Sequence, residues 1–224
     1  MKKIVLSPKD NERIKDAVRE AESKTSGEIV TAIINESSDY AFYELLASIV
    51  GGFLYYTICL IFYSDISGLL QNMFWSYSDI FPTLFIGITT VLVIGLLYLI
   101  SNINGVDRLI VPSKVISRKV NRRALLFFGE SGLFNTRDRT GVLLFISLRE
   151  KRVELLADSG INDKVKQEDW AEIVNNLISR LKENRMVDGL VEAVNSCGEM
   201  LVENFPIKPD DENELSDDVH ILED

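Results

Sequence analysis

The stretch KTSGEIVTAIINESSDYAFYELLASIVGG, from Lys24 to Gly52, changes character halfway along its length. A Ser-Gly turn leads into the β-branched run Ile29–Ile34, which is typical of a buried strand. Soon afterwards, from Leu45 onward, the chain becomes far more apolar. A single strand is not stable without partner strands, so the rest of the sheet must come from another part of the chain.

Two long segments contain no charged residue, and their apolar cores are residues 45–63 and 81–101. Each core is about 20 residues long, which is enough for a helix to cross about 30 Å of hydrocarbon. Buried core helices are the alternative, but such helices are usually shorter and have a polar stripe. The sequence therefore predicts two transmembrane helices joined by an extracytoplasmic connector at 64–80.

The distribution of basic residues predicts the orientation of this hairpin. The connector has no Lys or Arg, and basic loops stay on the cytoplasmic side of a membrane. Two spans return the chain to its starting side, so we expect both termini to be cytoplasmic. The basic residues that follow the second span are Arg108, Lys114, Arg118, Lys119, Arg122 and Arg123.

An amphipathic helix is expected over residues 113–128, directly after the second span. Its basic face is a candidate contact with the anionic headgroups of the lipid bilayer. A solvated helix face, or neutralisation by the acidic tail, is the alternative. The candidate membrane-surface residues are Arg118, Lys119, Arg122 and Arg123, and the apolar stripe expected to pack on the sheet is Val115, Ile116, Val120 and Leu125.

The soluble segments on the two sides of the hairpin provide the missing strands. We predict an α/β fold, in which one compact sandwich domain has a short β-sheet with helices on both faces. The domain comprises residues 1–40 and 102–206, and the hairpin is an insertion at a loop, where insertions are best tolerated. The expected elements are a helix that starts at Ser7-Pro8, strands at Glu28–Ile34, Val142–Leu148 and Arg152–Asp158, a helix that carries Trp170 to Leu181, and a helix over Met186–Asn204.

The net charge of −10 is concentrated at the end of the chain. Residues 207–224 form an acidic tail, in which eight acidic residues and no basic residue lie from Asp210 onward. The remainder of the chain is nearly neutral, so no basic surface for nucleic acid is implied.

Four motifs in this order resemble one known family. KTSGEIV, TRDRTGVLLFISLREKRVELLADSGI, DGLVEAVNSCGEML and FPIKPDDENELSDDV, with two spans after the first, are similar to the bacterial membrane branch of TPM-domain proteins. The resemblance covers essentially the whole chain. It implies a compact α/β sandwich and a multi-pass protein of the bacterial cytoplasmic (inner) membrane.

The resemblance implies less about activity. Relatives in photosynthetic organisms are linked to photosystem repair and to acid phosphatase activity with divalent-cation binding, whereas other relatives are auxiliary membrane proteins. The position before Thr136-Arg137 is often His in this branch, but it is Asn135 here. Histidine chemistry at that position cannot operate in this chain.

Arg137 and Arg139 are candidates for binding an anion. They lie in the run TRDRT, directly before a predicted strand. Guanidinium groups bind phosphate or carboxylate with two parallel hydrogen bonds. The alternative is that one of them pairs with a carboxylate of the domain itself.

Asp158 is a candidate metal ligand, because it ends a strand and ligands bind near strand ends in α/β folds. Asp210, Asp211, Asn213 and Glu214 provide further oxygen atoms of the kind that Ca²⁺ or Mg²⁺ prefers. A solvated acidic tail is the alternative.

Two functions remain after other mechanisms are set aside. The only histidine is His220, and there is neither a Cys/His pattern for zinc nor a glycine loop for phosphate. The first function is an interaction or auxiliary module for a membrane protein partner, which the apolar sheet favours. The alternative is a divalent-metal-assisted phosphatase of the TPM type, in which carboxylates hold the metal and arginines hold the phosphate.

Overall fold

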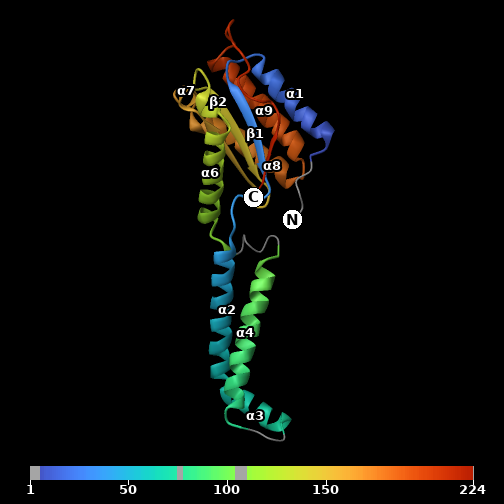
Figure 1. The fold of residues 1–224 in the computed structure, drawn as a ribbon, viewed down its shortest axis with the longest axis vertical. Coiled ribbons are helices and arrows are strands. Elements are labelled where there is room, and N and C mark those ends of the chain that lie inside the picture. The colour runs from blue at the N-terminus through green and yellow to red at the C-terminus, as the bar shows by residue number, and fades with distance from the viewer. Residues whose placement is uncertain (1–5, 75–77, 104–109, 224) are drawn as a thin grey trace. The chain divides into compact units, whose positions relative to one another are not determined.

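The computed structural model describes residues 6–74, 78–103 and 110–223 (Figure 1). Arg108 and a small part of the predicted connector lie outside the described residues. The chain divides into two compact units, one formed by Met1–Ser38 with Lys114–Asp224 and one formed by Asp39–Ser113. The following paragraphs describe each unit by itself.

The first unit contains a four-stranded sheet with the order β3-β2-β1-β4. β1 (Glu28–Ile34) pairs in parallel with β2 (Gly141–Ser147), and β2 pairs antiparallel with β3 (Arg152–Ala157). β1 precedes the hairpin in the sequence and β2 follows it, so strands from both flanking segments pair in one sheet. The predicted α/β sandwich is confirmed.

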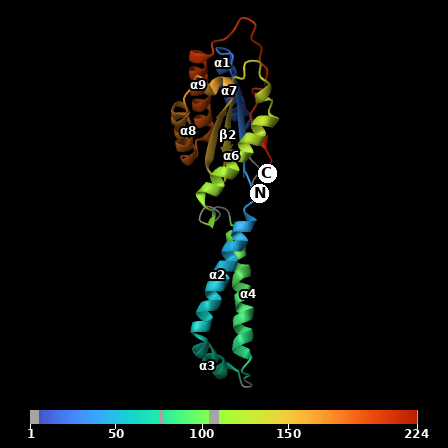
Figure 2. The same ribbon diagram turned by 90° about the vertical axis from the view of Figure 1, so that its left-hand side faces the viewer.

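Helices cover both faces of this sheet (Figures 1 and 2). Side chains alternate along a strand, so Ile29 and Ile33 of β1 join one core cluster with residues of α1, α8 and α9. Val30 faces the opposite side, where α6 lies, and it is buried as well. The helices of this unit are α1 (Pro8–Glu22), α6 (Ser113–Glu130), α7 (Ser159–Asn162), α8 (Gln167–Lys182) and α9 (Met186–Asn204), with a 3-10 turn η1 (Leu133–Asn135) before β2.

The buried stripe of α6 differs from the stripe expected from the sequence. Leu125 is 50% exposed, whereas Ala124, Phe127 and Phe128 are buried. Leu125 follows Val120 by five residues, which rotates it by about 140° around the helix axis. The stripe through Val120 therefore continues at positions 124, 127 and 128, and Leu125 points elsewhere.

The strand β4 (His220–Leu222) was not expected from the sequence. It lies in the segment 207–224, which the sequence analysis treated as an acidic tail. It pairs in parallel with Ala32–Ile34 of β1 and closes one edge of the sheet. Its three residues are too few to produce a recognisable strand pattern among so many acids.

The tail also makes ion pairs with α1, which corrects the alternative of a fully solvated tail. Arg19 Nε lies 3.2 Å from Asp217 Oδ2, and Asp217 is buried. Lys15 Nζ lies 2.8 Å from Asp218 Oδ1. Basic residues on α1 thus hold the acidic segment in place just before it enters the sheet.

The second unit contains two long apolar helices, α2 (Ala41–Ile61) and α4 (Phe81–Ser101), and the shorter α3 (Tyr63–Met73). Both long helices are long and apolar enough to cross a membrane. Only 22% and 6% of their most apolar windows are buried, unlike the core helices of a soluble protein. α2 packs on α4, and a Cβ atom at Gly52 would overlap Ile94, so glycine allows this close approach.

We predict that the first unit folds without the hairpin. Its core cluster contains no residue of the second unit, and removing an insertion at a loop changes mainly the loop-closure entropy. Replacing residues 39–113 by a short flexible linker should give a soluble domain with one cooperative urea transition and a free energy of unfolding of about 5–15 kcal/mol. Aggregation, or unfolding without a cooperative transition, would contradict the inserted-domain arrangement.

Candidate functional site

The charged candidates from the sequence meet at one end of the sheet. Arg137 and Arg139 lie in the loop between η1 and β2, and Asp158 directly follows β3. The tail passes the same loop, because Glu214 and Asp210 both bind Arg137. Residues that are far apart in the sequence are therefore neighbours here.

Arg139 pairs with a carboxylate of the domain. Its Nε lies 2.9 Å from Asp158 Oδ2, and the Asp158 side chain is 2% exposed. Asp158 Oδ1 also accepts a hydrogen bond of 2.6 Å from Ser159 N, so this carboxylate is the N-cap of α7. The geometry at Arg139 and Asp158 stabilises the loop and the start of the helix.

Gly160 allows the arginine loop to lie directly over α7. A Cβ atom at Gly160 would lie 2.7 Å from Asp138 O and 2.8 Å from Arg139 O, which is too close for any other residue. Gly160 N donates to Arg139 O at 3.1 Å. Arg139 itself has a φ of 58°, a conformation that is uncommon for a residue with a side chain.

Arg137 is engaged by the tail. Its Nη1 donates to Asp210 Oδ2 at 3.1 Å, and its main-chain N donates to Glu214 Oε2 at 3.1 Å. Lys208 Nζ binds Asp138 Oδ2 at 2.5 Å in the same loop. The basic and acidic candidates therefore neutralise one another. Exposed pairs of this kind contribute about 0–1 kcal/mol each to stability.

The candidate metal ligands do not form a ligand shell. Within the described part of the chain, no three His, Cys, Asp or Glu side chains are grouped so that they could hold a metal ion. Asp158 and Asp210 face arginines, and Asn213 Nδ2 donates to Asp217 Oδ1 at 2.7 Å. Asp211 is half-buried in the same tail segment.

The strand-end argument for Asp158 also changes with the observed topology. β3 runs antiparallel to β2, so its carboxyl end lies beside the amino ends of β1 and β2. Ligands of open α/β sheets bind at the carboxyl ends of the parallel strands. Asp158 therefore lies at the opposite end of the sheet from the usual site.

Two acids nearby, the buried Glu28 and the half-buried Glu22, were missed by the sequence analysis. Glu28 is 6% exposed, and its Oε1 accepts from Glu214 N at 3.1 Å while its Oε2 has no partner among the described residues. Glu22 Oε1 accepts from Ile29 N at 2.8 Å. Burial raises the pKa of Glu22 to about 9, and it raises the pKa of Glu28 as well. The sequence did offer a signal for Glu28, because an acid stands there at the first position of a strand that is otherwise typical of a buried one.

The four basic residues predicted to face the membrane lie outside the core of the first unit. Arg118 and Arg122 are exposed, and Arg123 Nη1 lies 3.7 Å from Glu130 Oε2. Lys119 is half-buried. The proposed contact of these residues with lipid headgroups stays a prediction.

Comparison with known proteins supports the family assignment. The TPM domain family matches residues 104–200 of this chain. The NMR structure of the BA42 protein from the psychrophilic bacterium Bizionia argentinensis sp. nov. is similar over 99% of each chain, with a TM-score of 0.59 and 20% sequence identity, which concerns the fold alone. A comparison with the curated proteins found no match. Residues 104–200 therefore match the TPM domain family, which confirms the predicted resemblance to this family, whereas the membrane branch stays a prediction.

We predict that Glu22 lowers the stability of the first unit above neutral pH. Its pKa is raised from 4.5 to about 9, so between these values the carboxyl is protonated in the folded chain and ionised in the unfolded chain. Its contribution to stability is therefore lost as the pH rises through this window. Glu22→Gln keeps an acceptor for Ile29 N, and it should raise the free energy of unfolding at pH 8 by about 1–3 kcal/mol with little change at pH 4.

Urea unfolding followed by Trp170 fluorescence in a Trp75→Phe background measures this difference for the first unit. Glu12→Gln, an exposed position on the same helix, is the matched control and should show no comparable pH dependence. An effect of Glu22→Gln that is the same at both pH values would contradict the prediction.

Proposed function

We propose that this protein is a membrane-anchored cytoplasmic TPM-domain protein that acts as an interaction or auxiliary module for a membrane protein partner. The observation that carries the proposal is the pairing of the candidate charged groups with one another. Arg139 with Asp158 and Arg137 with Asp210 use the side chains that a phosphate or a metal ion would need. An enzyme site instead needs convergent polar groups that remain open to a substrate.

The remaining reactive side chains support the same proposal. Cys197 is fully buried on α9, and burial raises the pKa of its thiol to about 12, so it does not form a thiolate nucleophile. His220 lies in β4 with its ring 5.3 Å from that of Phe127.

The alternative function is a divalent-metal-assisted phosphatase. One observation favours it, since two arginines and several carboxylates lie together at one end of the sheet. Rearrangement of the tail would be required to free these groups. Substitution of a residue in these ion pairs can therefore distinguish the two functions.

We predict that the purified full-length protein hydrolyses para-nitrophenyl phosphate no faster with Mg²⁺ or Ca²⁺ than with EDTA. The Asp158→Asn variant, which keeps an N-cap for α7, should give turnover within about twofold of the wild-type chain. Asp163→Asn, an exposed residue just after α7, is the matched control. Metal-dependent turnover that Asp158→Asn abolishes and Asp163→Asn preserves would overturn the interaction proposal.

We also predict that the TPM domain lies in the cytoplasm, where a partner would meet it. In a background without Cys59 and Cys197, a Ser67→Cys substitution in α3 should react with a membrane-impermeant maleimide in intact cells, because the connector lacks basic residues. A Lys9→Cys substitution in α1 should react only after lysis. Labelling of Lys9→Cys in intact cells would reverse the topology.

A further inference from the structure

The outer edge of β3 offers main-chain hydrogen-bonding groups. Asp158 N donates to Gly141 O at 2.9 Å, in the same register as the β2–β3 ladder. In an antiparallel ladder, residues bonded to the neighbouring strand alternate with residues whose N–H and C=O groups point away from it. Val153, Leu155 and Ala157 therefore direct their main-chain groups toward the free edge.

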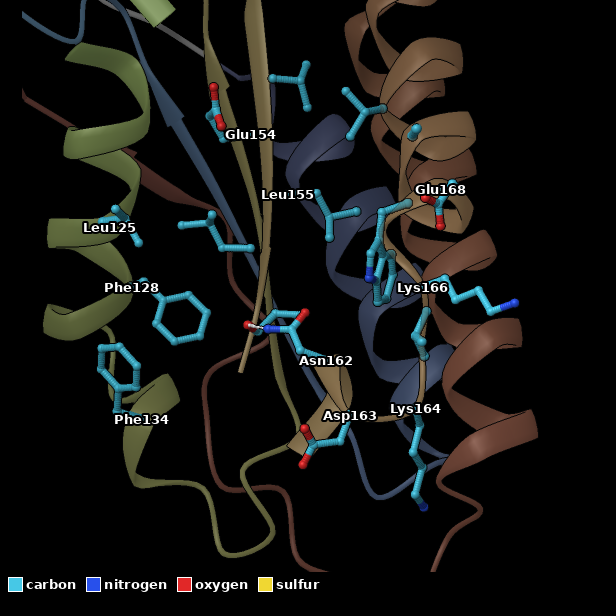
Figure 3. Close-up of a pocket in the computed structure, with 17 residues that line it drawn as sticks. Leu125, Phe128, Phe134, Glu154, Leu155, Asn162, Asp163, Lys164, Lys166 and Glu168 are labelled. Carbon is cyan, nitrogen blue, oxygen red and sulfur yellow. Dashed lines mark hydrogen bonds between the residues drawn. The ribbon is translucent and has the colours of Figure 1, made fainter. Parts of the chain in front are cut away.

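Asn162 marks the end of this free edge. Its Nδ2 donates to Ala157 O at 2.7 Å, which agrees with an outward direction for that carbonyl (Figure 3). Among the described residues, no main-chain hydrogen bond outside the β2–β3 ladder involves Val153 or Leu155, so their N–H and C=O groups are open to a further strand. β3 contains neither a Pro nor a bulge, two of the devices that protect an edge strand from pairing, and its charged residues are Arg152 and Glu154.

This edge lies in a groove of about 1040 Å³ between α6 and α8, hereafter the edge groove. Figure 3 shows the labelled aromatic residues on one side of β3 and the residues at the start of α8 on the other. An added strand would alternate its side chains between these two walls, and both walls offer apolar surface. The apolar residues of the walls are Leu125, Phe128 and Phe134 on the α6 side and Trp170 and Val174 on the α8 side.

Three features of the walls indicate an occupant. Leu125 and Phe134 are 50% and 43% exposed, so both present apolar surface to the groove. The indole N–H of Trp170 has no acceptor among the described residues. Lys166 lines the groove at the amino end of α8, is exposed and forms no ion pair within the described part of the chain, so its ammonium group is open to a carboxylate of an occupant.

We propose that the edge groove binds an extended segment of the partner protein as an additional strand on β3. Apolar side chains of this segment alternate between the α6 wall and the α8 wall, and an acidic side chain lies beside Lys166. This inference rests on the proposed interaction role and narrows it to one site and one partner chemistry. An acyl chain cannot use the main-chain groups of the edge.

The test uses the full-length protein in lipid nanodiscs and a displayed library of short random peptides as the probe. Enriched peptides should alternate apolar residues along an extended segment and have an acidic residue at one end. Leu125→Glu should lower their affinity about tenfold or more, because it places a charge in the α6 wall. Leu126→Glu is the matched control, because Leu126 is 53% exposed on the same helix and does not line the groove.

A second pair of variants tests the charged end of the groove. Lys166→Glu should weaken binding of the acidic peptides, whereas Lys182→Glu at the far end of α8 should not. On binding, hydrogen exchange should slow at the amides of Val153 and Leu155. A library without enriched peptides, affinities that Leu125→Glu leaves unchanged, or protection confined to another strand would each overturn the proposal. A dimer that Leu125→Glu dissociates would also overturn it, by making a second copy the occupant.

Photo-crosslinking in cells separates this proposal from the broader function. If Leu125→Glu captures the same membrane protein as the wild-type chain, the edge-groove proposal fails and the interaction role stands. If neither chain captures a membrane protein, the interaction role itself fails.

Discussion

The parallel pairing of β1 with β2 is the constraint on which the rest of the structure depends. The register joins Glu28 to Gly141 and Ile34 to Ser147, and every residue of both strands is buried. A parallel pair that is buried on both faces needs helices on both sides. The elements before and after the hairpin must therefore fold as one domain, whatever the inserted segment does.

The same constraint explains the charged end of the sheet. A parallel β1–β2 pair places the start of β2 beside the start of β1, and the antiparallel β3 brings Asp158 back to that end. Arg137 and Arg139 occupy the loop before β2, where they meet Asp158 and the returning tail. The cluster is thus a consequence of chain topology, and its charges balance each other instead of remaining open for a ligand.

The long, strongly patterned elements could be predicted from the sequence, and the features set by packing could not. β1, β2 and β3 have continuous apolar runs or a clear hairpin, and α2 and α4 have uniform apolar composition. β4 has only three residues, and its pairing depends on the edge of β1 rather than on its own pattern. The burial of Glu28 and the exposure of Leu125 depend on which face meets a neighbour, and periodicity defines that face only to within a residue or two.

The two edges of the sheet differ in whether another segment of the chain covers them, and the proposed interaction role rests on this difference. The chain covers the β1 edge with its own C-terminal segment, which ion pairs to Lys15 and Arg19 hold in place. The β3 edge has no such cover within the described residues, although exposed edges favour aggregation and are normally protected. It lies instead in the edge groove between α6 and α8. Addition of a strand from another protein to an unpaired sheet edge is a common mode of peptide recognition, and this edge is the feature of the fold on which the proposed interaction role rests.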